Sequence, residues 1–324
     1  MKKIGRILLV ILVLTSLILG GCASKGGTPS AGNGGTEKGK TFKVGINNFG
    51  QANFFARIGK TSLEDEIKKN GGEVIATVNT DVPGRVAAIE NMVSQGVNAI
   101  IIEEGDITQV AAALKEAKKK GIVIGSMDAG DADFVDVYVS SDNPLLGQKA
   151  AEQMMKLTNG KGNIVEIYND AGDMIKARKE AMHKVVANYP DAKVAYGFVY
   201  SWPDFFPDVK SKMEAILQAH PKAGDIAAVF ATFDGAGVAA AQAIREKGLQ
   251  NNIVIVGIDG DPEAYKEMRK PDSPFKATLA QDPDTIARTT VDKVFEILKG
   301  NKLTDKIFHI PGVLITKDNI PANQ

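Results

Sequence analysis

The sequence predicts an α/β protein built from two doubly wound, parallel-sheet (Rossmann-like) domains joined by a hinge. Apolar, β-branched runs alternate with amphipathic stretches along most of the chain, and several of these runs end at an acidic residue. The clearest of these runs is Asn252–Asp261, with the sequence NIVIVGIDGD. The same pattern recurs in Gly121–Asp128, Asn98–Asp106 and Asp225–Asp234. Continuous Val/Ile runs indicate strands buried on both faces of a parallel sheet. Ligands bind beyond the carboxyl ends of such strands, so these acids are candidate site residues.

The first 22 residues are predicted to be a lipoprotein signal peptide. A basic start is followed by the apolar run Ile7–Leu19, which is shorter than the roughly 20 residues needed to span a bilayer. The run ends in LGGC, which resembles the bacterial lipobox and implies lipidation (palmitate) of Cys22. Cys22 is the only cysteine, so no intramolecular disulfide can form. Residues 23–40 contain Gly, Ser, Thr, Pro, Asn and Lys and predict a flexible tether.

The first predicted domain starts at Thr41 and alternates strands with helices. Gly71 and Gly96 are placed to end the first two helices, and Pro83 lies in the first turn of the second. The predicted strands are Phe42–Asn47, Glu73–Val78, Ala99–Ile102, Ile122–Ser126 and a weaker Asp136–Val139. The predicted helices are Asn53–Lys69, a second between Pro83 and Gly96, and Ile107–Lys120.

A second round of the same pattern follows. Its predicted helices are Leu145–Leu157, Ile175–Asn188, Pro207–Ala219, Gly237–Lys247, Pro262–Arg269 and Pro283–Lys299. Its predicted strands are Asn163–Tyr168, Lys193–Val199, Ile226–Ala231, Ile253–Ile258, Phe275–Ala280 and one or two within Ile307–Ile315. Right-handed crossovers between parallel strands make each round a doubly wound sheet. The predicted lobes are residues 41–141 plus 282–309 and residues 142–281 plus 310–324, with the first hinge crossing at Asp142–Pro144.

From about Thr41 to Thr316 the chain resembles the periplasmic sugar-binding proteins of the ribose/galactose-binding (type I, LacI-like) class. The matching stretches are VGINNFGQANFF, the strand-end Asp128, YVSSDN, KARKEAM, AVFATFD, VGIDGDP and KATLAQDP, in the family's order. The resemblance implies the periplasmic-binding-protein-like I fold. It also implies a substrate-binding lipoprotein that captures a monosaccharide, or a related polyhydroxylated ligand, by hinge closure and serves an ABC importer.

The resemblance also implies the ligand-binding residues. They are Asn48, Phe54, Phe55, Asp128, Arg178, Trp202, Phe233, Asp259 and Gln281. Ala129 stands where the family has an arginine, and Phe233 where it has an asparagine. These two departures put plain D-ribose in doubt and favour a deoxy, methylated or differently configured ligand.

The residue types suit a sugar. A carboxylate accepts from two neighbouring hydroxyls, an arginine donates in a planar fork, and aromatic rings cover the apolar C–H face. Each has a plainer interpretation: strand-end aspartates also cap helices, and Arg178 with Lys176 and Lys179 is also consistent with an exposed basic face. Glu103 and Glu104 directly follow an apolar strand, and they line the cleft, contact the importer or form a solvated loop.

Other function classes fit less well. A net charge of zero argues against a nucleic-acid partner. The stretch GAGVAA (Gly235–Ala240) matches a dinucleotide fingerprint, but Asp234 would repel a pyrophosphate there. No hydrolase motif or metal-ligand spacing is found, so no enzymatic activity, cofactor or metal is expected. A sensor that reports to a membrane kinase or chemoreceptor stays open. The expected protein is a monomer at the outer face of the cell membrane or in the periplasm, and its partners are a sugar and a permease.

Overall fold

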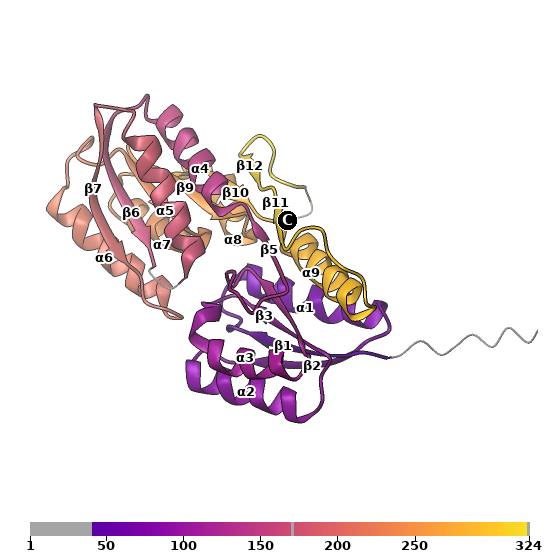
Figure 1. The fold of residues 1–324 in the computed structure, drawn as a ribbon. Helices are drawn as coiled ribbons and strands as arrows, with labels where there is room; N and C mark the ends of the chain where they lie inside the picture. The colour runs from indigo at the N-terminus through magenta and orange to yellow at the C-terminus, as the bar shows by residue number, and fades with distance from the viewer. Residues whose placement is uncertain (1–40, 170–171, 323–324) are drawn as a thin grey trace, which may run out of the picture. The chain divides into compact units, whose positions relative to one another are not determined.

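The computed structural model describes residues 41–169 and 172–322, which form two six-stranded sheets with helices on both faces (Figure 1). The predicted signal peptide, Cys22 and the tether lie outside the described residues. Among the residues that are described, no helix has both the length and the apolar character needed to cross a membrane. The predicted α/β fold with two parallel-sheet domains is confirmed.

All strands of the first sheet run parallel, in the order β11-β5-β4-β3-β1-β2. They are β1 (Lys43–Asn48), β2 (Glu73–Val78), β3 (Ala99–Glu103), β4 (Val123–Met127), β5 (Val137–Ser141) and β11 (Ile307–Ile310). The register places Asn48 beside Glu103, and Glu103 beside Met127. The residues after these strands therefore meet at one edge of the sheet.

The second sheet has the order β12-β10-β9-β8-β6-β7 and is parallel except for β12, which pairs antiparallel with β10. Its strands are β6 (Gly162–Tyr168), β7 (Ala192–Val199), β8 (Ala228–Ala231), β9 (Val254–Asp259), β10 (Phe275–Ala280) and β12 (Val313–Thr316). β8 and β9 are almost entirely buried, as their Val/Ile/Ala sequences predict.

Each sheet carries apolar cores on both faces. The helices of the first lobe are α1 (Phe54–Lys69), α2 (Val82–Ser94), α3 (Ala111–Lys119) and α9 (Pro283–Leu298). Those of the second lobe are α4 (Asn143–Leu157), α5 (Asp173–Val186), α6 (Phe205–Ala219), α7 (Asp234–Glu246) and α8 (Pro262–Arg269). Helix α9 follows β10 of the second sheet but packs on α1 and the first sheet, so the lobes exchange chain segments.

Several predicted helices differ from the observed ones at their first turns, and α4, α5, α6 and α7 each begin two or three residues before the predicted start. The predicted helix Ile107–Lys120 is divided into a 3-10 turn, Ile107–Val110, and α3. The Asp106 carboxylate causes this, because it accepts hydrogen bonds from the backbone N–H and the hydroxyl of Thr108 and so caps a tighter turn. Helix α6 begins at Phe205, two residues before Pro207. A proline is tolerated there because the first N–H groups of a helix have no intrahelical partner.

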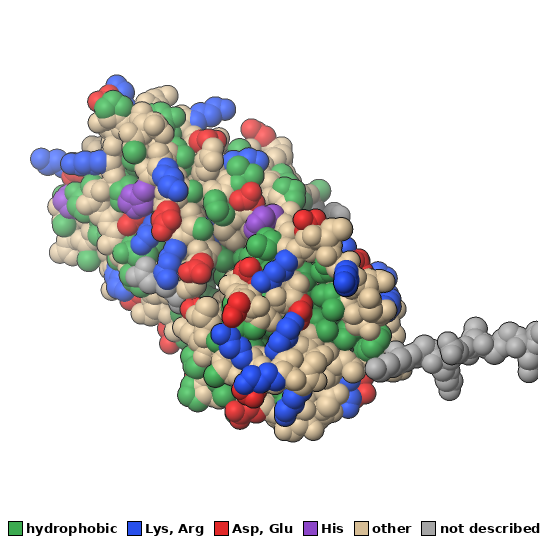
Figure 2. Space-filling view, in the orientation of Figure 1, with side chains coloured by type: hydrophobic (Ala, Val, Ile, Leu, Met, Phe, Trp, Pro, Cys, Tyr) green, Lys and Arg blue, Asp and Glu red, His purple; other side chains and the backbone are tan. Residues whose placement is uncertain are grey.

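Three short connections join the sheets: β5 to α4 through Asp142, β10 to α9, and β11 to β12. Asp142 accepts a hydrogen bond from the Leu145 N–H at 3.0 Å and caps α4 directly after the first crossing. The lobe boundaries and the hinge stay predictions. The assignment of the strands to the two sheets supports them. On the face shown in Figure 2, acidic and basic side chains are interspersed, in keeping with the zero net charge.

Candidate ligand-binding site

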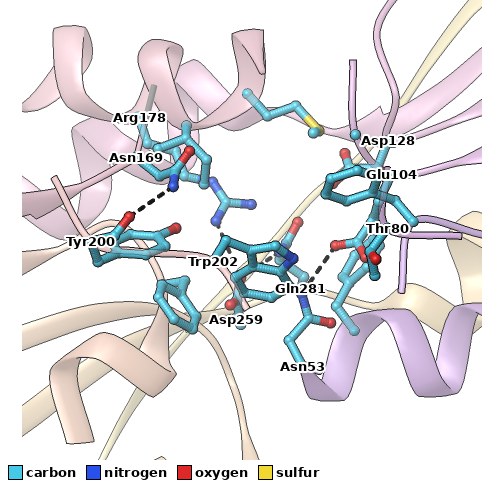
Figure 3. Close-up of a pocket in the computed structure, with 16 residues that line it drawn as sticks. Asn53, Thr80, Glu104, Asp128, Asn169, Arg178, Tyr200, Trp202, Asp259 and Gln281 are labelled. Atoms are coloured by element: carbon cyan, nitrogen blue, oxygen red, sulfur yellow. Dashed lines mark hydrogen bonds and ion pairs between the residues drawn. The ribbon is translucent and has the colours of Figure 1, made fainter. Parts of the chain in front are cut away.

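A cavity of about 250 Å³ lies where the carboxyl ends of the two sheets face each other, and it is lined from both lobes (Figure 3). It lies close to the lower end of the roughly 300–1,000 Å³ that is usual for small-molecule sites. The first lobe contributes residues that follow β1, β2, β3 and β4, and the second lobe contributes residues of or after β6, β7, β8 and β9. This is the place that the strand-end pattern predicts.

Three acids line the cavity, and all three have unusual backbone conformations. Glu104 follows β3 with a φ of 55°, Asp128 follows β4 with a φ of 52°, and Asp259 ends β9 with a φ of 137°. In the described part of the chain, Asn159 is the only other non-glycine residue with positive φ. Such conformations cost about 1–3 kcal/mol each and concentrate at functional sites. The strained backbone at all three acids therefore indicates that the cavity is a functional site.

Arg178 connects Asp259 to other segments of the second lobe. Its side chain is only 3% exposed. Nε donates to the Asn143 side chain at 2.7 Å, and Nη1 donates to the Thr232 carbonyl at 2.9 Å and to Asp259 Oδ1 at 3.2 Å. Gln281 Nε2 also donates to Asp259 Oδ1, at 2.6 Å. The exposed basic face considered for Arg178 is therefore wrong, because this guanidinium is buried and paired.

Glu104 is held from several sides in the first lobe. Asn53 caps α1 by accepting from the Ala56 N–H at 2.7 Å, and its Nδ2 donates to Glu104 Oε1 at 3.2 Å. The Glu104 N–H donates to the Met127 carbonyl at 2.9 Å. Arg85, which is fully buried, donates from Nη2 to the Glu104 carbonyl at 3.2 Å. Of the alternatives for Glu104, the solvated loop is excluded, because its side chain lines the cavity.

Burial raises the pKa values of the cavity acids. Loss of hydration raises the pKa of Glu104 to about 8, and the nearby charge of Asp128 adds to the effect. Loss of hydration also raises the pKa of Asp128 to about 6, although Arg178 opposes it. The pKa of Asp259 is raised by the same cause and is opposed chiefly by Arg178. The cavity by itself therefore does not stabilise all three carboxylates in the ionised form.

An aromatic cluster forms the wall on the second lobe. Trp202 stacks on Phe205 at 5.8 Å between ring centroids, and Phe233 meets Phe205 edge-on at 4.8 Å and Tyr200 at 4.9 Å. Phe233 is 4% exposed and belongs to both the apolar core and the cavity lining. Such a wall presents flat apolar area to a ring or to a carbon chain.

Several cavity-lining polar atoms have no hydrogen-bond partner among the described residues. They are Asp128 Oδ1, Gln281 Oε1 and Trp202 Nε1. A buried polar atom without a partner costs about 1–3 kcal/mol. A ligand would therefore donate hydrogen bonds to Asp128 Oδ1 and Gln281 Oε1 and accept one from Trp202 Nε1.

Seven of the nine predicted ligand-binding residues line the cavity. They are Phe55, Asp128, Arg178, Trp202, Phe233, Asp259 and Gln281. Asn48 is not in the lining, because it is fully buried and donates to Glu103 Oε2 at 2.6 Å. Phe54 is not in the lining either, because successive helix positions point about 100° apart and Phe55 takes the inward direction.

The lining also contains polar residues that the sequence interpretation missed. They are Asn53, Thr80, Asn169 and Tyr200. Asn169 and Tyr200 directly follow β6 and β7, so the rule that selected the aspartates would have found them if it had been applied to every strand. Asn53 was recognised only as the start of a helix, and nothing in its sequence context indicates that its amide reaches Glu104.

The dinucleotide fingerprint has a structural explanation. Asp234 Oδ2 accepts from the N–H groups of Gly260 and Asp261 at 2.8 and 2.9 Å and from the Thr278 hydroxyl at 2.8 Å. A methyl group at Gly237 would lie 2.5 Å from the ring of Phe275. The start of α7 is therefore filled by protein side chains, and its glycines allow close packing. In the described residues, no group of three or more His, Cys, Asp or Glu side chains is placed to hold a metal ion.

Residues 44–302 match the family model described as a periplasmic binding protein domain. The chain belongs to this family. It is 28% identical to a ribose import binding protein of Bacillus subtilis, over 92% of this chain and 95% of the relative. It is also 28% identical to a galactofuranose-binding protein of Escherichia coli, over 82% and 84% of the two chains. A solved ABC transporter solute-binding protein of Agrobacterium vitis with bound allitol is 26% identical, with a TM-score of 0.82 over 87% of this chain and 97% of that one.

These matches confirm the predicted resemblance to type I sugar-binding proteins. The chain is a solute-binding protein of the sugar ABC transporter kind and not an enzyme, and the dinucleotide-dependent alternative is wrong. The family is extracytoplasmic.

Close packing of two helices positions the arginine of this binding protein. Gly147 of α4 lies against α5, and a methyl group there would come within 2.3 Å of the Arg178 carbonyl oxygen and 2.6 Å of its Cα. We expect Gly147→Ala to lower the free energy of unfolding by about 1–3 kcal/mol, because the helices must separate. Urea denaturation measures this. Lys149→Ala, an exposed change on the same helix, is the control and should stay within about 0.5 kcal/mol of wild type. A Gly147→Ala protein as stable as wild type would contradict the packing argument.

Proposed function

We propose that this binding protein captures a small polyhydroxylated ligand, a monosaccharide or a related polyol, between its two lobes and delivers it to an ABC importer. The observation that carries the proposal is the cavity, which combines strained carboxylates, a buried arginine and an aromatic wall. Relatives named for ribose and galactofuranose, and a structure with bound allitol, support this class of ligand.

The contacts define how such a ligand would be held. Asp128 from the first lobe and Asp259 from the second accept from hydroxyls, Arg178 donates to ligand oxygens, and Trp202 and Phe233 cover the apolar face. Because the acids belong to different lobes, one ligand bridges both and favours the closed form. In place of a polar contact, Phe233 supplies apolar wall, which supports a ligand with fewer hydroxyls than ribose at that side.

A thermal-shift screen tests the proposal. The full-length chain is melted with pentoses, hexoses, deoxysugars, polyols and nucleosides. A ligand at one hundred times its dissociation constant adds about 2.7 kcal/mol of stability and so raises the melting temperature visibly. We expect one or two sugars or polyols to do so and Asp259→Asn to remove the shift. No shift from any sugar or polyol, or an equal shift in the variant, would contradict the proposal.

We also propose the finer features that the sequence predicts: a lipid anchor at Cys22, a monomeric state and partnership with a permease. The lipobox pattern supports the anchor, and the family supports the permease. The anchor would hold the lobes near the importer at the outer face of the membrane, with residues 23–40 as the tether.

A further inference from the structure

The charge of the cavity does not balance. Glu104, Asp128 and Asp259 line it, and among the described residues the only cationic side chain in the lining is Arg178. Arg178 forms its ion pair with Asp259. Neither Glu104 nor Asp128 has an ion-pair partner in the described part of the chain. If all three acids are ionised, the lining carries two negative charges more than positive ones.

The layer behind the cavity contains one cation, Arg85, which forms no ion pair with a cavity acid in the described part of the chain. Arg85 lies behind Glu104, and Glu103 lies beside it as a second buried acid. Loss of hydration raises the pKa of Glu103 well above its usual range, and the charge of Arg85 opposes this rise. Arg85 donates from Nε to the Asn47 side chain at 2.9 Å and from Nη2 to the Glu104 carbonyl, and not to the Glu104 carboxylate. Asp106, further along the loop, adds another acid.

Glu104 is positioned to meet a ligand. Its Oε1 accepts from Asn53, and Oε2 has no hydrogen-bond partner among the described residues. Its backbone is held in the left-handed region at a φ of 55°. Asp128 is 3% exposed, and its Oδ1 is also without a partner in the described part of the chain. Two carboxylate oxygens on the first-lobe side of the cavity are therefore free to accept (Figure 3).

A neutral sugar does not compensate this charge. Its hydroxyls satisfy the hydrogen bonds of a carboxylate but leave the charge, and uncompensated charge in a buried site is costly. A protonated amine satisfies both, since it donates up to three hydrogen bonds and carries the opposite charge. The second lobe, where Arg178 already pairs with Asp259, needs no such group and suits neutral hydroxyls.

We propose that the ligand is an amino sugar or amino polyol, whose protonated amine lies between Glu104 and Asp128 while its hydroxyls face Arg178 and Asp259. This inference rests on the proposed function and narrows its ligand class. It places the determinant of specificity on Glu104, at the first-lobe side of the cavity.

Matched pairs of ligands test the inference. Calorimetric titration of the full-length chain compares D-glucosamine with D-glucose, D-galactosamine with D-galactose, and 1-amino-1-deoxysorbitol with sorbitol. The N-acetyl form of each amino sugar is the neutral control. In at least one pair we expect the amine to bind tenfold or more tightly than its hydroxyl twin, a difference of about 1.4 kcal/mol. Its N-acetyl form should lose this preference.

Two variants locate the effect. Glu104→Gln keeps the shape and the Asn53 hydrogen bond but removes the charge, and it should reduce the preference for the amine at least tenfold. Glu90→Gln removes the same charge from the exposed face of α2 and should leave the preference as in wild type.

The inference would be overturned if, in every pair, the sugar or polyol bound as tightly as its amine counterpart, or if the preference for the amine survived Glu104→Gln. Either result would leave the proposed sugar-binding function standing. If no member of any pair binds and the broader sugar panel of the thermal-shift screen is also flat, the proposed function and this inference both fail.

Discussion

Replacing Arg178 by methionine is expected to lower the free energy of unfolding by about 3–5 kcal/mol, because it leaves Asp259 as a buried charge without its partner. The guanidinium is 3% exposed and donates to Asn143, Thr232 and Asp259. Methionine fills much of the same volume, so the main change is electrostatic. Urea denaturation measures the loss. The same variant should weaken ligand binding on the order of 100-fold or more, which titration calorimetry measures.

A second substitution separates stability from binding. Asp259→Asn added to Arg178→Met removes the uncompensated charge, so the double variant should regain part of the lost stability. Ligand binding should not return, because both groups that face the hydroxyls have then been changed. An Arg178→Met protein that unfolds at the wild-type urea concentration would show that the ion pair is not a structural element. Recovery of binding in the double variant would show that neither group contacts the ligand.

The stability of the ligand-free protein should fall as the pH rises from about 4 to 8. Burial raises the pKa of Asp128 from 3.8 to about 6 and the pKa of Glu104 from 4.5 to about 8. Between each pair of values the native state keeps a proton that the unfolded chain has lost. The native state therefore binds more protons, and stability decreases with rising pH by about 1.4 kcal/mol per pH unit for each such acid. Urea denaturation at a series of pH values measures the slope.

Glu104→Gln tests the origin of this slope, because glutamine does not titrate. The variant should be more stable than wild type at pH 9, by on the order of 2–4 kcal/mol, and its stability should depend less on pH between 5 and 8. Glu90→Gln should follow the wild-type curve. A wild-type stability that increases with pH over this range, or a Glu104→Gln curve parallel to that of wild type, would show that Glu104 is ionised without cost in the native state.

Much of the fold follows from local pattern in the sequence. The Val/Ile runs of β8 and β9 require burial on both faces, and this leads to parallel sheets covered by helices on both sides. Helix starts were less predictable, because they depend on single side chains. Asp106, for example, produces a 3-10 turn before α3 by accepting from Thr108, and the apolar periodicity of the helix carries no sign of this.

Some residues of the candidate site could likewise be predicted from the sequence, and others could not. Strand-end position identified Asp128 and Asp259, since parallel strands of one sheet end at one edge, and most of these ends in both lobes open on the cavity. Glu103 and Glu104 are both strand-end acids by that rule. The sequence does not distinguish them, because the backbone turn at Glu104 decides which side chain enters the cavity and which stays buried beside Asn48.

The fold class, the family and the residue types of the site could be predicted from the sequence, because burial periodicity and strand-end position are local properties of the chain. Which polar atoms meet depends on how the helices and sheets pack. Packing pairs Arg178 with Asp259 and gives Asp234 a structural role, whereas Glu104 and Asp128 have no ion-pair partner in the described part of the chain. The reason is physical: a hydrogen bond or an ion pair depends on distances of a few ångströms between segments far apart in the sequence. Those distances are set by how helices and sheets pack, and no local pattern encodes them.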